Sequence, residues 1–265
     1  MDNTIILNFG DSQGEIWDYV FYNNSNYITY QDNKNVGWRS GWSIRGLKKY
    51  EHQKRLFDEI PKLAKKNKRI IITLTFGSTD IEWNLSYKRF INKEFPDVEI
   101  FINQMKDNLL DVINKYLELQ NKIKGLDLQI IVCFPFIPLP LSNEYMKKFA
   151  FRTNSIYYQV INHNERIELW NRFCNKIINS ISSNQNYNKK IHIFDLRKTF
   201  LDKGFNYFCR KDLEDHHPDL SISHLEITKI LDNYIFYDNK NISFYLNYKN
   251  WQFDFMYPHL RRPFK

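Results

Sequence analysis

The sequence predicts an α/β protein with a parallel sheet, and three observations carry this prediction. Short apolar runs alternate along the chain with segments of helical periodicity, and this order implies right-handed crossovers between parallel strands. Residues 70–76 form a run rich in β-branched side chains, which is typical of a strand buried on both faces of a parallel sheet. Residues 5–9 form a second such run, which ends at once in Gly10-Asp11-Ser12.

Each expected element rests on its local pattern. Strands are expected where apolar, β-prone residues follow one another between turn signals. These segments are residues 5–9, 27–30, 70–76, 128–134 and 190–195. Helices are expected where apolar residues recur at helical spacing, as at Met105, Leu109, Val112 and Tyr116. The helical segments are residues 15–22, 48–65, 102–119, 167–181 and 224–236.

Three segments are longer than simple turns. Residues 134–165 contain three prolines and exceed a mere connector, so we expect a loop or lid that faces the substrate. Residues 200–223 form a polar loop that holds most of the histidines of interest. Residues 237–265 are rich in aromatic side chains, which are costly to expose, so we expect them to pack on the domain. The predicted organisation is one α/β domain over residues 1–236 and an aromatic C-terminal extension over residues 237–265.

The composition favours a globular protein inside the cell. The chain has 265 residues, of which 43% are hydrophobic, and this argues against disorder. No apolar run reaches the roughly 20 residues of a membrane span. The N-terminus has no secretory pattern, and the three cysteines suit neither a disulfide framework nor a metal site. We therefore expect a cytoplasmic protein without a metal.

The net charge of +8 favours anionic partners, but nothing more specific points to nucleic acid. The basic cluster Lys62, Lys65, Lys66, Lys68 and Arg69 lies between an expected helix and a strand, where it is typical of a solvated helix end. The chain has no RNP, zinc-finger or helix-turn-helix signature. We expect no nucleic-acid partner, and no pattern indicates an oligomeric state.

Candidate functional residues follow the predicted strands. Ser12 lies on a tight turn after the first strand and is a candidate nucleophile, provided that a base reaches it. Gly46 belongs to a glycine-containing turn before a helix, where backbone N–H groups can face a ligand. Thr79 and Asp80 follow the buried strand 70–76, and the alternative interpretation is that Asp80 only caps the next helix.

A histidine-rich segment precedes the last expected helix. It reads Glu214-Asp215-His216-His217-Pro218-Asp219, and His224 follows shortly after it. Histidines among carboxylates can supply a base and the acid that orients it. The alternative is a solvated surface loop.

The order of these segments resembles that of the SGNH (GDSL-like) hydrolase superfamily over most of the chain. The resemblance implies a three-layer α/β/α sandwich with a mainly parallel five-stranded sheet, as in flavodoxin-like folds. It implies that Ser12 is the nucleophile and that the N–H of Gly46 contributes to the oxyanion hole. It also implies a histidine base in the last block and no metal or organic cofactor.

Two departures from the family pattern matter for the site. The third family block is usually Gly-x-Asn-Asp, whereas this chain has Gly77-Ser78-Thr79-Asp80 and lacks the Asn that donates to the oxyanion. Loss of such a donor costs about 10²–10³ in rate, unless another group such as Thr79 replaces it. The chain therefore looks closer to a divergent Phe-Gly-x-x-Asp variant.

The second departure is that the last loop has no perfect Asp-x-x-His. We rank His217 first as the base, oriented by Asp215 or Glu214, and the pair His224 and Asp219 second.

The resemblance predicts a serine-dependent acyl-ester hydrolase or acyltransferase. Members of the divergent group often lie near glycan-modifying genes, so the expected substrate is a small molecule or glycan with an acyl group. The alternative is a catalytically weakened member whose fold serves as a glycan- or protein-binding module, with the altered oxyanion site as a remnant of lost activity.

Overall fold

The protein is described here as a computed structural model that covers residues 4–22, 27–31, 37–142, 144–147, 160–187, 189–209, 217–231 and 242–246. Its centre is a parallel sheet in the order β2-β6-β1-β3-β4-β5. The strands are β1 (Thr4–Gly10), β2 (Tyr27–Gln31), β3 (Arg69–Thr75), β4 (Asp127–Phe134), β5 (Ile191–Asp195) and β6 (Ile242–Leu246).

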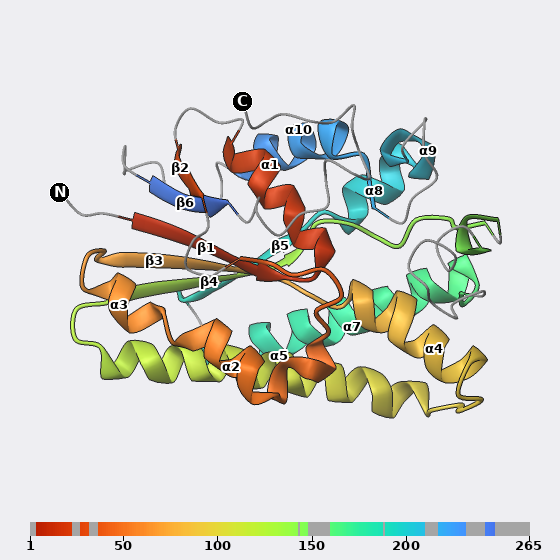
Figure 1. Cartoon of the computed structure of the whole chain (residues 1–265), viewed down its shortest axis with the longest axis horizontal. Helices are drawn as coiled ribbons and strands as arrows, with labels where there is room; N and C mark the ends of the chain where they lie inside the picture. Colours follow the sequence, from red (N-terminus) through yellow and green to blue (C-terminus); the bar gives the residue numbers. More distant parts are fainter. Residues whose placement is uncertain are drawn as a thin grey trace.

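Helices cover both faces of this sheet (Figure 1). One face carries α1 (Ile16–Tyr22), α8 (Arg197–Lys203), α9 (Phe205–Phe208) and α10 (Leu220–Leu231). The other carries α2 (Tyr50–Phe57), α3 (Ile60–Ala64), α5 (Val98–Lys122) and α7 (His163–Ser182), with α4 (Leu85–Phe90) beside them. Short helical turns complete the chain at η1 (Ser12–Glu15), η2 (Ile44–Lys48), η3 (Thr79–Asn84) and η4 (Gln185–Tyr187).

The predicted α/β/α sandwich with a parallel sheet is confirmed. All five expected strands are present, and residues 242–246 add a sixth strand, β6, between β1 and β2. This strand lies in the segment expected to form the C-terminal extension. The division of the chain at residue 236 stays a prediction.

Two helices differ from their predicted bounds. The helix expected over residues 48–65 is divided into α2 and α3, because the second helix starts afresh with Pro61 in its first turn. The last helix, α10, starts at Leu220 rather than at residue 224, and residues 232–236 lie outside the described part of the chain.

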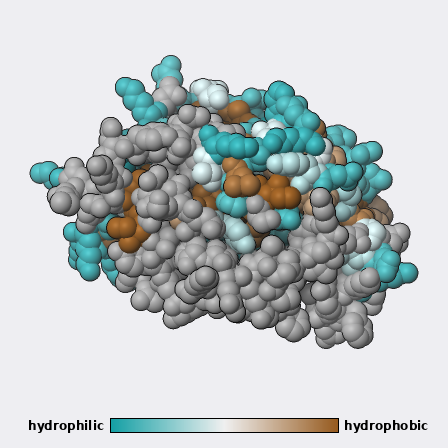
Figure 2. Space-filling view, turned by 90° about the horizontal axis from the view of Figure 1, so that it is seen from above, coloured by the Kyte–Doolittle hydropathy of each residue, from teal (hydrophilic) through white to brown (hydrophobic). Residues whose placement is uncertain are grey.

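The core lies where β1, β3 and β4 meet the two helical layers. Phe9 of β1 stacks on Tyr116 of α5 with ring centroids 6.4 Å apart, and Trp17 of α1 packs against Phe194 of β5 at 5.3 Å. Seen from above, hydrophobic residues show near the middle of this face, and hydrophilic ones show along its upper edge (Figure 2). Within the described ranges, no helix is both long enough and apolar enough to cross a membrane.

The carboxyl ends of β1 and β3 approach each other closely. The Asp11 N–H donates to the Thr75 carbonyl over 2.9 Å, and a Cβ added to Gly10 would lie 2.3 Å from that same oxygen. Because the obstructing atom belongs to the backbone, only glycine fits here. The turn that carries Ser12 is therefore fixed against the end of β3.

Asp80 joins the end of β3 to η2. Its buried carboxylate accepts the Ile44 N–H over 2.7 Å and the side-chain amide of Asn84 over 3.2 Å. Burial raises the pKa of Asp80 to about 6, and hydrogen bonds from Ile44, Asn84 and Arg45 oppose this rise. The carboxyl group therefore anchors the segment over residues 44–48 from inside the protein.

We predict that this raised pKa makes stability fall as the pH rises. The folded state holds the Asp80 proton up to about pH 6, whereas the unfolded chain releases it near 3.8. The stabilisation that the Asp80 proton gives is complete below pH 3.8 and is lost between pH 3.8 and 6. The free energy of unfolding falls by about 3 kcal/mol over this range. In urea unfolding from pH 4 to 7, the free energy of wild type should fall relative to that of Asp80→Asn.

The control for loss of a charge is Asp58→Asn, because Asp58 is exposed at the end of α2. Its stability difference from wild type should stay nearly constant over the same pH range. Parallel curves for wild type and Asp80→Asn would show that Asp80 does not titrate between these pH values.

Candidate active site

Ser12 and His217 meet at the carboxyl edge of the sheet. Ser12 is the first residue of η1, directly after β1, and His217 lies shortly before α10. The His217 Nε2 lies 2.8 Å from the Ser12 Oγ, although the two residues are 205 positions apart. A hydroxyl within hydrogen-bond reach of an imidazole is the arrangement that activates a serine nucleophile.

Asp11 holds the turn in front of Ser12. One carboxylate oxygen accepts the Ser78 hydroxyl over 2.8 Å and the N–H groups of Gly77 and Thr79 over 3.2 and 3.3 Å. The other oxygen accepts the Gln13 N–H over 3.0 Å. One side chain thus connects η1 to the segment that follows β3, and it fixes the position of Ser12.

Burial and hydrogen-bond donors have opposite effects on the pKa of Asp11. Complete burial raises the pKa of Asp11, while the hydrogen bonds from Ser78, Gln13 and Thr79 lower it. The charge of His217 also lowers the pKa of Asp11.

The described residues offer one clear oxyanion donor. The Ser12 N–H stands at the N-terminus of η1, where helical N–H groups have no partner within the helix, and no acceptor for it lies among the described residues. The Gly46 N–H donates to the Ser43 hydroxyl over 3.1 Å, within its own turn. The Thr79 N–H donates to Asp11, and Asp80 binds Ile44. Among the described residues, none of these last three groups forms a hydrogen bond with Ser12, and their roles stay predictions.

The structure describes the two predicted pairs of a histidine and a carboxylate to different extents. Asp215 and Glu214 lie outside the described residues, so the acid that would orient His217 stays a prediction. The His224 Nδ1 bonds the Leu220 carbonyl over 2.9 Å inside α10, and its ring packs on Tyr19. Asp219 stands at the start of α10, where its carbonyl accepts the Ser223 N–H.

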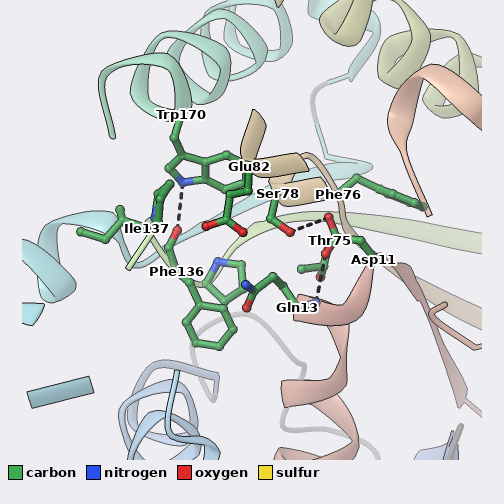
Figure 3. A pocket seen from close by; sticks show the side chains of 11 residues that line it. Asp11, Gln13, Thr75, Phe76, Ser78, Glu82, Phe136, Ile137 and Trp170 are labelled. Atoms are coloured by element: carbon green, nitrogen blue, oxygen red, sulfur yellow. Dashed lines mark hydrogen bonds between the residues drawn. The ribbon is translucent and has the colours of Figure 1, made fainter. Parts of the chain in front are cut away.

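A narrow pocket is lined by Asp11 and Gln13, the residues on either side of Ser12 in the sequence (Figure 3). About 20 Å³ of it is open to water-sized molecules. Its walls come from the end of β3, from η1 and η3, and from the proline-rich segment after β4. The lining residues are Asp11, Gln13, Thr75, Phe76, Ser78, Glu82, Pro135, Phe136, Ile137, Pro138 and Trp170. Most of these side chains are apolar, so the pocket suits a small apolar group.

A buried ion pair supports one wall of this pocket. The Glu82 carboxylate points into the pocket (Figure 3), and Arg166 of α7 contacts it over 3.2 Å. Arg166 also donates to the carbonyls of Leu139 and Ile161 over 2.9 and 3.0 Å. Both charged side chains are 1% exposed. Sequence reasoning missed this pair, because Glu82 and Arg166 are 84 positions apart and no local pattern connects them.

The groups around Ser12 are of the kinds that nucleophilic acyl transfer requires. In the described ranges, no cluster of three or more His, Cys, Asp and Glu side chains could hold a metal ion. The arrangement offers a serine hydroxyl, an imidazole that contacts it, a backbone donor and a small apolar pocket. Together these groups can attack an acyl carbonyl and hold the acyl group.

Among known proteins, the chain is similar to solved structures only. No family model and no curated protein matches the sequence. A protein from Streptococcus pneumonia, provisionally described as a platelet activating factor, is 12% identical over 88% of this chain and 84% of its own, with a TM-score of 0.43. A catalytic mutant of Axe2, an acetylxylan esterase from Geobacillus stearothermophilus, is 13% identical over 87% of this chain and 94% of its own, with a TM-score of 0.42. A second variant of that esterase is 14% identical over 86% and 92%, with a TM-score of 0.39. The function must therefore be inferred from the residues around Ser12.

Proposed function

We propose that the protein is a serine-dependent esterase or acyltransferase that acts on an acyl group of a carbohydrate or glycan. The observation that carries this proposal is the 2.8 Å contact between the Ser12 Oγ and the His217 Nε2. The contact joins residues that are 205 positions apart in the chain, and it occurs at the sheet edge where open α/β folds bind their ligands.

The reaction would proceed through an acyl-enzyme. The Ser12 oxygen attacks the ester carbonyl while its proton passes to the His217 Nε2, and the carbonyl oxygen becomes an oxyanion near the Ser12 N–H. His217 then returns the proton to the departing alcohol as the C–O bond breaks. Water gives hydrolysis and a second alcohol gives transfer: either one attacks the acyl carbon, loses its proton to His217 and regenerates the Ser12 hydroxyl.

Charges near His217 support its role as the base. A protonated His217 forms in the first step, and the buried Asp11 carboxylate attracts that charge. We propose Asp215 or Glu214 as the further carboxylate that orients the imidazole, because both precede His217 closely in the sequence.

The pocket lined by Asp11 and Gln13 limits the size of the acyl group. Its small volume and its walls of Phe136, Ile137 and Trp170 favour a short acyl chain such as acetyl. The carbohydrate part of the proposal rests on the resemblance of the sequence blocks to glycan-modifying SGNH hydrolases.

One observation favours a second function, that of a binding module with little catalysis. Thr79 stands where the SGNH pattern has its oxyanion Asn, and its N–H is engaged by Asp11. A chain that had lost its activity could keep the same fold to bind a glycan or a protein.

We predict that Ser12→Ala abolishes ester turnover and leaves stability nearly unchanged, because the nucleophile is lost while the turn keeps its backbone bonds. The measurements are hydrolysis of p-nitrophenyl acetate and the urea midpoint. A fluorophosphonate probe should label wild type at Ser12, as read by mass spectrometry. The control is Ser183→Ala, because Ser183 is an exposed serine at the end of α7. Its ester turnover and its urea midpoint should match those of wild type. Turnover by Ser12→Ala at the wild-type rate would eliminate Ser12 as the nucleophile.

We predict that His217→Ala lowers kcat for the same ester by about 10²–10⁴, the usual contribution of a general base. His224→Ala should retain most activity, because the imidazole of His224 is engaged within α10. Both variants are assayed beside His216→Ala. If only His224→Ala loses activity by several decades, His224 is the general base instead, and Asp219 is the acid that orients it.

We predict that Thr79→Asn leaves esterase activity flat or lowers it. Thr79 is 6% exposed at the start of η3, so the longer amide has little room in a site built for a different donor. A degraded hydrolase would behave in the opposite way and would gain up to about 10²-fold when the donor is restored. Steady-state hydrolysis of p-nitrophenyl acetate by both proteins separates the enzyme from the weakened binding module.

A further inference from the structure

A second cavity lies outside the narrow pocket. Its volume is about 300 Å³, and none of its residues lines the pocket described above. The segment before η2 and the helix α2 form its walls. The lining residues are Arg39, Ser40, Gly41, Trp42, Glu51, His52 and Arg55. A cavity of this size can take a ligand as large as a monosaccharide.

The cavity adjoins the turn that carries Ser12. The Arg39 N–H donates to the Gly10 carbonyl over 2.9 Å, two residues before Ser12. Trp42 packs edge-on against Phe76 at the end of β3 with ring centroids 5.4 Å apart. Successive Cα atoms are 3.8 Å apart, so these contacts put the cavity wall on the order of 10 Å from Ser12. One substrate molecule can therefore reach both places.

The charges on the walls favour an anion. Two guanidinium groups, Arg39 and Arg55, line the cavity together with one carboxylate, Glu51. The Arg55 guanidinium carbon lies 5.8 Å from the centroid of the Trp42 ring, within reach of a cation–π contact that orients the side chain. A guanidinium held in this way can form paired hydrogen bonds to a carboxylate or a phosphate.

His52 adds a polar group that suits a sugar. Its Nδ1 lies 2.7 Å from the Gly46 carbonyl, which can only accept, so Nδ1 carries the proton. In the neutral imidazole Nε2 is then an acceptor, which suits a sugar hydroxyl. The buried Trp42 ring also lines the cavity, and its centroid lies 5.4 Å from that of His52.

We propose that this cavity binds an anionic substituent, a carboxylate or a phosphate, on the alcohol part of the substrate. The inference rests on the proposed function and specifies its substrate class. The acyl group enters the apolar pocket while the acidic sugar that carries it is held by Arg39 and Arg55. The substrate class is then an acyl ester of an acidic carbohydrate.

The test measures binding without turnover. Ser12→Ala protein is titrated by calorimetry with glucuronate, with glucose 6-phosphate and with glucose. We expect at least one charged sugar to bind and glucose to bind at least about tenfold more weakly. The better of the two charged sugars identifies the carboxylate or the phosphate as the natural group.

Four added substitutions in the Ser12→Ala protein locate the binding. Arg39→Gln and Arg55→Gln should each weaken binding of the charged sugar by about tenfold or more, because each loses a charged hydrogen bond. Glu51→Gln should tighten it, because a repelling charge is removed. Lys54→Gln removes a positive charge from an exposed position of α2 outside the cavity, and it should bind like its parent. Thermal melting checks that each variant is folded.

Several results would overturn the proposal. These are equal binding of glucose and both charged sugars, no binding of any sugar at millimolar concentration, and equal effects of Arg55→Gln and Lys54→Gln. Failure of the proposed function is read separately, from fluorophosphonate labelling and ester turnover of the protein with Ser12 intact. Labelled, active protein that binds no charged sugar would reject the anion site alone.

Discussion

The buried carboxylate of Asp11 is the interaction on which the rest of the site depends. It accepts four hydrogen bonds, three from the segment after β3 and one from the turn that carries Ser12. A buried carboxylate without partners would cost several kcal/mol, and removal of a single partner costs about 1–3 kcal/mol. These bonds satisfy the charge and at the same time fix two strand ends to each other. Ser12 keeps its position because the four hydrogen bonds of the neighbouring Asp11 fix the turn.

Polar side chains inside the sheet extend this constraint. Asn8 of β1 donates to the Gly14 carbonyl over 2.7 Å and accepts the Thr73 hydroxyl over 3.0 Å. The Trp17 indole N–H donates to the Thr75 hydroxyl, also over 3.0 Å. The bonds to Thr73 and Thr75 join the first strand and the helix after it to β3, and the bond to Gly14 joins the first strand to η1. Buried polar groups need such partners, so the network favours one arrangement of these segments over any other.

Local patterns predicted most of the fold but only part of the site. The runs at residues 5–9, 70–76 and 128–134 are buried on both faces, so their apolar character identified them as strands. The strand at residues 242–246 was missed, because an aromatic segment close to the end of the chain reads as a packed tail. The helix break near Pro61 was missed because the apolar spacing continues through it.

Local patterns likewise pointed to some residues of the candidate site and missed others. Ser12 was predicted from three adjacent residues, and His217 from a short cluster of carboxylates and histidines. Gly46 shows why the rest was harder: its backbone N–H is engaged by Ser43, and no sequence pattern reports whether a donor is already occupied. The pair of Glu82 and Arg166 and the basic cavity both arise where distant segments meet. Only the fold brings such residues together.

The position of β6 has a consequence for how the protein is made on the ribosome. This strand pairs with both β1 and β2, yet it is synthesised more than 200 residues after them. Until it emerges, the nascent chain holds β1 with one unpaired edge and leaves β2 without its partner in the sheet. An exposed edge of that kind invites pairing with other chains, so the growing polypeptide should depend on chaperones for most of its synthesis. Completion of the sheet becomes a late event in biogenesis, and nearly the whole chain must exist before the serine at the end of β1 gains its final surroundings.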